Sequence, residues 1–217
     1  MNIFEAYNYL LESEDISRLH KIFARYEIFK KVVDIPGDIV ECGVFKGTGH
    51  IFWLKLLKIY DPISIKKVIG FDTFNNFPST SLEYEKKNID IFIKSSKYKP
   101  VSITEINKKI QKLDMSKRSE LIKGDITKTS SIYSKKNKGF KISLLHLDLD
   151  TYEGTKSALN TFYKHITRGG IILLDEYGKR GWGETDAVDE FLENNSKLKI
   201  KSVKFSNQPT SFIIKEN

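Results

Sequence analysis

Short runs of consecutive apolar residues alternate along this chain with longer segments in which apolar residues recur every three or four positions. Continuous apolar runs are typical of strands buried on both faces of a parallel sheet, and the second pattern is typical of helices packed against it. The first pattern predicts strands at residues 38–42, 68–72, 121–125, 142–147 and 171–174. The second predicts helices at residues 16–34, 51–60, 103–113, 154–165 and 186–194.

The end of the chain departs from this alternation. Two β-like runs, 200–205 and 211–214, flank Asn207-Gln208-Pro209, which predicts a terminal hairpin. The alternation without repeats or an interdomain linker predicts one domain, 1–217, built as a doubly wound α/β fold with a mostly parallel sheet and an antiparallel edge. Residues 1–35 are expected to form an N-terminal helical cap, and residues 75–118 a variable insertion or lid.

Composition indicates the class of protein and the compartment in which it is expected. The 217 residues are 40% hydrophobic and 29% charged, as in an ordinary globular protein. Cys42 is the single cysteine, so an intrachain disulfide is excluded and a cytoplasmic location is expected. Residues 1–15 lack a basic segment followed by an apolar one, and no run reaches the roughly 20 apolar residues of a membrane span. We therefore expect neither a signal peptide nor a membrane partner.

The formal net charge of +8 raises the question of a nucleic-acid partner. The lysines are scattered, mostly at the ends of predicted elements and in loops, and no RNA-binding module is appended. That distribution favours a lysine-rich solvated surface over a nucleic-acid interface.

Acidic residues close two of the predicted buried strands. Asp148 and Asp150 follow the strand at 142–147, and Asp175 and Glu176 follow the strand at 171–174. Parallel neighbours bring both pairs to the carboxyl edge of the sheet, where open α/β folds bind ligands. Four carboxylates there repel one another unless some are protonated or a cation lies among them. The pattern therefore predicts a site for magnesium or another oxygen-seeking divalent cation.

A glycine-bearing turn, residues 41–49, joins the first strand to a helix. It is neither a P-loop nor a clean G-x-G-x-x-G sequence, and Glu41 is poorly suited to a pyrophosphate. A cofactor with positive charge, such as S-adenosylmethionine, tolerates Glu41 better. Asp72 closes the next strand, where it is placed to bind ribose hydroxyls, and Asp125 closes the third, within expected reach of an adenine amine.

These stretches resemble the class I S-adenosylmethionine-dependent methyltransferases, and more closely the macrocin O-methyltransferase (TylF-like) family. The resemblance extends from about residue 19 to residue 195. It is carried by residues 36–47 (PGDIVECGVFKG), 70–74 (GFDTF), 147–155 (LDLDTYEGT), 169–177 and 187–191 (AVDEF). It implies a seven-stranded Rossmann-like sheet and methyl transfer to a hydroxyl of a small molecule, most often a sugar or glycosylated metabolite. A homodimer is compatible with it.

The resemblance also implies roles for single residues. It makes Asp150 the general base and Asp148, Asp175 and Glu176 the ligands of a divalent metal, usually magnesium. Glu176 departs from the family, which more often has a second aspartate there. The residues expected at the cofactor are Glu41, Gly43, Gly47, Asp72, Thr73, Asp125 and Asp148.

Several residues keep two interpretations. His146 shares the strand parity of Asp148 and Asp150, yet a packed, hydrogen-bonded histidine is favoured over a ligand. Trp182, between two glycines, is either a lid residue facing the substrate or an ordinary loop aromatic. Lys179 and Arg180 are either solvated or placed to meet a phosphate. Two alternative functions remain. The net charge of +8 encourages methylation of RNA, and the other alternative is a non-catalytic S-adenosylmethionine-binding protein that retained the cofactor fold, against which the intact set of four acidic residues speaks.

Overall fold

The computed structural model describes residues 2–78, 80–95 and 101–216. Seven strands form one sheet in the order β3-β2-β1-β4-β5-β7-β6, in which β1 to β5 run parallel and β7 is antiparallel to both β5 and β6. The strands are β1 (Asp38–Cys42), β2 (Val68–Asp72), β3 (Ser119–Lys123), β4 (Ile142–Leu147), β5 (Ile166–Leu174), β6 (Ile200–Ser202) and β7 (Ser211–Ile214). The predicted fold class, with its antiparallel terminal hairpin, is confirmed.

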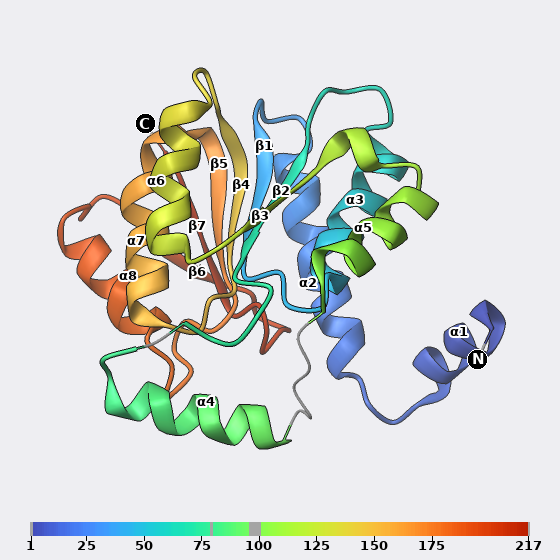
Figure 1. The fold of residues 1–217 in the computed structure, drawn as a ribbon, viewed down its shortest axis with the longest axis horizontal. Helices are drawn as coiled ribbons and strands as arrows, with labels where there is room; N and C mark the ends of the chain where they lie inside the picture. The colour runs from blue at the N-terminus through green and yellow to red at the C-terminus, as the bar shows by residue number, and fades with distance from the viewer. Residues whose placement is uncertain (1, 79, 96–100, 217) are drawn as a thin grey trace.

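Helices cover both faces of this sheet (Figure 1). The α-helices are α1 (Ile3–Glu12), α2 (Ser17–Val32), α3 (Thr48–Tyr60), α4 (Glu83–Ser95), α5 (Ile103–Lys112), α6 (Ile126–Lys136), α7 (Tyr152–Phe162) and α8 (Glu184–Glu193). One apolar cluster joins the sheet to α6, α7 and α8, and the other joins it to α2, α3 and α5. The continuous apolar runs of β1, β4 and β5 are explained by this double coverage, because both faces of those strands are buried.

Parallel pairing brings the ends of three strands level with one another. Cys42 pairs with Leu147, and Leu147 pairs with Leu174. The next residues continue the ladder, since the Asp148 amide donates to the Cys42 carbonyl at 2.8 Å and the Asp175 amide to the Leu147 carbonyl at 3.0 Å. The strands β2 and β3 extend the sheet to one side of β1, and β4 and β5 extend it to the other, so the order of the strands reverses between β1 and β4. The acidic residues therefore lie at the crevice where such folds bind ligands.

Several element boundaries differ from those predicted. β3 begins at Ser119 and ends at Lys123, so Asp125 lies beyond the strand and caps α6 instead. β5 begins at Ile166, ahead of the Gly169-Gly170 pair, and the first strand of the terminal hairpin ends at Ser202. Helices α1, α4 and α6 were not predicted individually. Residues 79 and 96–100 of the predicted insertion lie outside the described part of the chain.

Two helices stand apart from the layers (Figure 1). The α1 helix projects from the body, and α4 passes beneath the end of the sheet at which the acidic residues lie. No residue of α1 is buried. Within the ranges that the structure describes, no helix combines the length and the apolar content that a bilayer crossing requires.

Candidate functional site

A cavity of about 730 Å³ opens at the carboxyl edge of the sheet. Its lining comes from the turn after β1, the end of β2, the segment after β4 and one side of α2. Phe77, Pro78 and Phe92 line it from the segment that carries α4. A cavity of this size accommodates a nucleoside cofactor and part of a second small molecule.

The glycine turn brings two backbone segments together at the base of this cavity. Gly43 has φ +94°, and a Cβ atom at this position would lie 1.8 Å from the Asp148 carbonyl oxygen. Gly47 has φ +80° immediately before α3, where a Cβ atom would lie 2.9 Å from the Ile106 side chain. Only glycine fits the first position, because any side chain would push the ends of β1 and β4 apart. Gly43 also lines the cavity.

Asp72 and Thr73, at the end of β2, also line the cavity. The Asp72 Oδ2 atom accepts the amides of Val44 and Phe45, both at 2.8 Å, and its Oδ1 atom accepts the Phe74 amide at 2.7 Å. Asp72 therefore holds the glycine turn in place with one oxygen. A carboxylate has about four acceptor positions. The Thr73 hydroxyl lies 3.5 Å from Oδ1 but is closer to the Asn76 carbonyl, at 3.0 Å, so one position on Oδ1 is left for a ligand.

Asp125 occupies a different place from the one predicted, since it does not end a strand. Its Oδ1 atom accepts the Thr127 amide at 2.9 Å and so caps α6. Its neighbours Gly124 and Ile126 line the cavity. The Asp125 side chain thus binds an amide at the start of α6, and its contact with a cofactor stays a prediction.

Glu41 is buried near the end of β1, between two histidines. Its Oε1 atom lies 3.5 Å from His146 Nδ1, and its Oε2 atom lies 3.6 Å from His50 Nδ1. Burial raises the pKa of Glu41, but hydrogen bonds from His146 and His50 and the charge of Arg25 outweigh it and lower the pKa to about 2. Glu41 is therefore ionised and supplies a fixed negative charge beneath the cavity.

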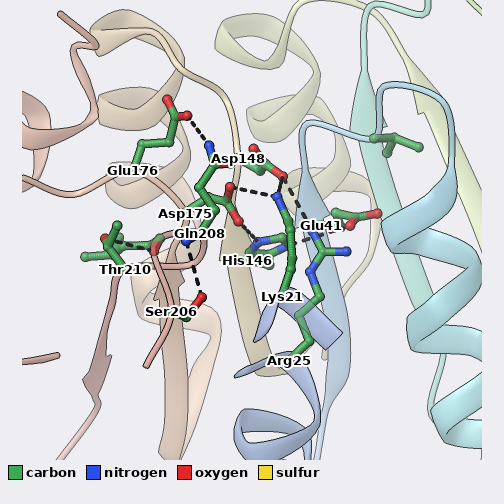
Figure 2. Close-up of polar contacts among 12 residues, drawn as sticks. Lys21, Arg25, Glu41, His146, Asp148, Asp175, Glu176, Ser206, Gln208 and Thr210 are labelled. Carbon is green, nitrogen blue, oxygen red and sulfur yellow. Dashed lines mark hydrogen bonds and ion pairs between the residues drawn. The ribbon is translucent and has the colours of Figure 1, made fainter. Parts of the chain in front are cut away.

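His146, Asp148 and Asp175 meet at the ends of β4 and β5 and form what we call the acidic group (Figure 2). One ligand atom each from His146, Asp148 and Asp175 lie within 4.8 Å of one another. His146 Nε2 lies 3.4 Å from Asp175 Oδ1, so this imidazole lies between Asp175 and Glu41. His146 is thus the packed, hydrogen-bonded histidine that was favoured, and it also offers a nitrogen to the group.

Two basic side chains of α2 reach the same group (Figure 2). Lys21 Nζ donates to Asp175 Oδ2 at 3.0 Å and lies 3.8 Å from Asp148 Oδ2. Arg25 Nη2 lies 3.6 Å from Asp148 Oδ2. Residues 21 and 25 are one helical turn apart, so both side chains leave α2 on the same face.

These neighbours separate the pKa values of the two aspartates. Burial and the nearby charge of Asp175 raise the pKa of Asp148 to about 6, despite the opposing effect of Lys21. Burial also acts to raise the pKa of Asp175, but the hydrogen bond from His146 and the charge of Lys21 hold it below its ordinary value. Asp175 is therefore the permanently ionised member, and Asp148 changes charge near neutral pH.

A second acidic group lies beside the first. Burial and the Glu176 carboxylate raise the pKa of Asp150 well above its ordinary value. Glu176 Oε1 accepts from Lys179 Nζ and Gln208 Nε2, both at 2.6 Å, while no amine, amide or hydroxyl donor of the described residues reaches its buried Oε2 atom. Glu184, which is buried, accepts the Glu176 amide at 2.9 Å.

The strand parity predicted for His146, Asp148 and Asp150 does not extend to Asp150. β4 ends at Leu147, and Asp150 has φ +64°. The chain turns between the two residues, so Asp148 faces α2 whereas Asp150 faces Glu176. Both still line the cavity.

The residues fit a divalent cation. Two carboxylates and an imidazole meet in one place, and the buried Oε2 atom of Glu176 lies nearby. Such donors suit magnesium or manganese. The predicted ligands Asp148 and Asp175 fall in one group, whereas the contacts of Glu176 direct its side chain toward Asp150, Lys179 and Gln208.

Aromatic residues form the opposite side of the cavity. The Phe92 ring on α4 lies 6.1 Å from Phe45, 5.8 Å from Phe77 and 6.4 Å from Trp182, measured between ring centroids. Trp182 therefore belongs to the contacts that hold α4 over the site, and Lys179 lies 6.0 Å from its ring. Trp182 is not among the described residues that line the cavity, so its contact with a substrate stays a prediction.

Sequence reasoning missed the basic side chains of α2, together with Glu184 and Gln208. The pattern at 16–34 marked the apolar face of the helix, but no feature of it indicated that Lys21 and Arg25 turn toward the acids. Their spacing of four residues was the available signal, because it places two cations on one helix face.

Comparisons with known proteins agree with this geometry. The family model described as macrocin-O-methyltransferase (TylF) matches residues 16–204. Demethyldecarbamoylnovobiocin O-methyltransferase of Streptomyces niveus is 25% identical over 163 residues, which cover 73% of this chain and 59% of that protein. Mycinamicin III 3''-O-methyltransferase of Micromonospora griseorubida is 24% identical over 149 residues, 66% of this chain and 56% of that protein.

Among solved structures, a calicheamicin methyltransferase superposes with a TM-score of 0.81 at 23% identity, covering 99% of this chain and 86% of that one. At this identity the similarity establishes the shared fold. The matched segments span less than two thirds of the two sequence relatives' own lengths.

Proposed function

The chain belongs to the macrocin-O-methyltransferase (TylF) family, and from that premise we propose that it transfers a methyl group from S-adenosylmethionine to a hydroxyl of a small glycosylated molecule or sugar. The observation that carries the proposal is the cavity itself. It joins the glycine turn after β1 to the acidic edge at Asp148 and Asp150. A cofactor held by the turn therefore faces the groups that would act on an acceptor.

The cofactor is assigned to the glycine-turn side. Gly43 lines the cavity at the turn, and the remaining acceptor position of Asp72 is placed to receive ribose hydroxyls. Thr73 lies next to Asp72 on the lining. Glu41 adds a buried negative charge, which favours a cofactor bearing a sulfonium and an ammonium. When bound, S-adenosylmethionine supplies an electrophilic methyl group.

The acceptor is assigned to the acidic side. Asp150 is proposed as the general base, because it lines the cavity and a carboxylate of raised pKa is a stronger proton acceptor once ionised. Asp148 and Asp175, with His146 or Glu176, would hold a divalent metal, which lowers the pKa of a coordinated hydroxyl. Phe45, Phe77 and Phe92 would exclude water above the acceptor.

The sugar class of the acceptor rests on the relatives, one of which is named 8-demethyl-8-(2,3-dimethoxy-alpha-L-rhamnosyl)-tetracenomycin-C 4'-O-methyltransferase. The net charge of +8 keeps RNA as the second candidate.

A transfer assay with isotope-labelled S-adenosylmethionine separates these functions. The assay compares a panel of nucleotide sugars and glycosylated metabolites with total RNA, using wild type and Asp150→Asn. We expect transfer to a sugar, lost by at least about 100-fold in Asp150→Asn while calorimetric cofactor binding is retained. Transfer to RNA alone would replace the proposal with the second candidate. Absence of cofactor binding to the wild type would refute methyl transfer altogether.

A further inference from the structure

The acidic group already has a cation. Lys21 Nζ contacts both aspartates of the group, at 3.0 Å from Asp175 Oδ2 and 3.8 Å from Asp148 Oδ2. Its side chain is four-fifths buried, so this ammonium is largely withdrawn from solvent. The α2 helix thus delivers a positive charge to the place where the ligand atoms of His146, Asp148 and Asp175 converge (Figure 2).

A divalent metal and this ammonium compete for the same oxygens. A metal bound to Asp175 would lie roughly 2 Å from the carboxylate oxygen, and therefore at most about 5 Å from an ammonium left in its present position. Two cations at that separation in a largely buried site repel each other strongly. The metal ion and the Lys21 ammonium therefore cannot both keep their contacts with Asp148 and Asp175.

The two basic residues of α2 differ in how firmly they are held. Arg25 is buried, and its guanidinium stacks over the Trp53 ring at 5.7 Å. Both residues line the cavity, but the Lys21 ammonium is carried on a flexible stem and its side chain is the more exposed of the two, so the ammonium can move out into that space. Of the two, Lys21 is the cation that can leave.

We propose that the Lys21 ammonium is the resident cation of the Asp148–Asp175 pair and that a divalent metal binds there by displacing it. This inference rests on the proposed function, because it concerns the metal of that same site. It makes Lys21 a positioning residue that weakens metal affinity. Metal binding then moves a positive charge from the acidic group into the cavity.

Metal affinity provides the first test, measured without turnover. Manganese is titrated into the chelator-treated full-length chain, and the signal of unbound Mn²⁺ is followed by electron paramagnetic resonance. Lys21→Met removes the charge and keeps the stem, and Lys30→Met is the matched control on the exposed side of the same helix, where Lys30 pairs with Glu27. We expect Lys21→Met to bind Mn²⁺ at least about tenfold more tightly, and Lys30→Met to match wild type within about twofold.

A second test needs no variant, and it applies if Lys21→Met does not fold. The amine of Lys21 is acetylated in wild-type protein with and without Mg²⁺, and labelling is read by mass spectrometry with Lys30 as internal reference. We expect Mg²⁺ to increase labelling of Lys21 severalfold and to leave Lys30 unchanged.

Defined results overturn the inference. These are unchanged or weaker Mn²⁺ binding in Lys21→Met, equal tightening in both variants, no Mn²⁺ binding to either protein, or Lys21 labelling that is constant or falls with Mg²⁺. Cofactor binding and methyl transfer are measured on the same samples. Their persistence alongside any of these results would refute the displacement of Lys21 and leave the proposed function standing.

Discussion

At the scale of single residues, the contact between Gly43 and Asp148 fixes how closely β1 and β4 meet at the site. A Cβ atom on residue 43 would lie 1.8 Å from the Asp148 carbonyl oxygen, so Gly43→Ala must separate the strand ends as well as adopt φ +94°. Gly178→Ala is the matched control, because Gly178 has φ +83° with nothing within 4 Å of its added Cβ. Urea denaturation should show a loss of about 1 kcal/mol for the control and at least about 3 kcal/mol for Gly43→Ala. Equal losses would mean that backbone conformation alone requires Gly43.

The raised pKa of Asp148 predicts a pH dependence of stability. With a folded-state pKa of about 6 against an ordinary value of 3.8, the folded chain binds a proton in this interval that the unfolded chain has released. The free energy of unfolding should therefore fall as pH rises from about 4 to about 6, by about 1 to 3 kcal/mol. Denaturation of chelator-treated protein across this range measures the slope.

The control for this dependence is Asp148→Asn, which removes the titrating group. We expect its slope to be shallower than that of wild type over the same interval. An identical slope in both proteins would assign the dependence to other groups and contradict the raised pKa of Asp148.

At the scale of elements, α4 is attached to the site through a buried carboxylate. Glu85 accepts the Tyr152 amide at the first turn of α7, at 2.7 Å, and also contacts the Thr80 hydroxyl. The end of a helix with free amides favours a negative charge, so this contact joins α4 to α7. It explains how a segment with little apolar burial of its own stays above the cavity.

Glu85→Ala should detach α4. We expect hydrogen exchange of residues 83–95 to rise by at least about tenfold, because the Tyr152 amide and Thr80 hydroxyl lose their acceptor. Glu83→Ala is the control on the same helix, where Glu83 is exposed and pairs with Lys86. Unchanged exchange in Glu85→Ala would show that the other contacts of α4 suffice to hold the helix. They include the ring contact of Phe92 with Trp182 and the hydrogen bonds from Tyr84 to Asp186 and from Asn88 to the Gly181 carbonyl.

The same scale shows what could be predicted from the sequence. The strands that carry the site were predictable, because continuous apolar runs are unambiguous where a strand is covered on both faces. The same reasoning misplaced Asp125, because an acidic residue after a short apolar run can either end the strand or cap the helix that follows. Asp125 caps α6 by accepting the Thr127 amide, and β3 ends only two residues before it, at Lys123. The α4 helix was hidden because its anchor, Glu85, is a charged residue buried by a distant partner, a relation that no local pattern contains.

For the whole molecule, the acidic residues at the carboxyl edge of the sheet could be predicted from the ends of the strands, whereas the basic side chain that neutralises them could not. Asp148 and Asp175 follow neighbouring parallel strands, and the topology alone brings them together. Lys21, which contacts both aspartates, is 154 positions away from Asp175 in the chain. Which face a helix turns toward a crevice depends on packing of the whole domain, so the counter-cation became visible only in the assembled fold.

The α1 helix is the part of the molecule whose packing the fold does not explain. None of its residues is buried, and Ile3, Phe4 and Leu11 are at least half exposed. Apolar side chains gathered on one projecting helix are typical of a contact with another molecule, and whether that molecule is a second copy of this chain stays a prediction. Deleting residues 1–13 should therefore leave the melting temperature of dilute protein within about 2 °C of wild type, because no core contact is lost.

The control for this deletion is Phe29→Ala, which removes a fully buried ring of α2 and should destabilise the chain by about 3 to 5 kcal/mol. Sedimentation of full-length and shortened chains over a range of concentrations measures assembly. If the full-length chain is a dimer, the shortened chain should sediment as a monomer, since the exposed apolar residues of α1 are the surface being removed. A shortened chain that melts more than about 5 °C lower when dilute would place α1 against its own domain, and one that still dimerises would place the interface elsewhere.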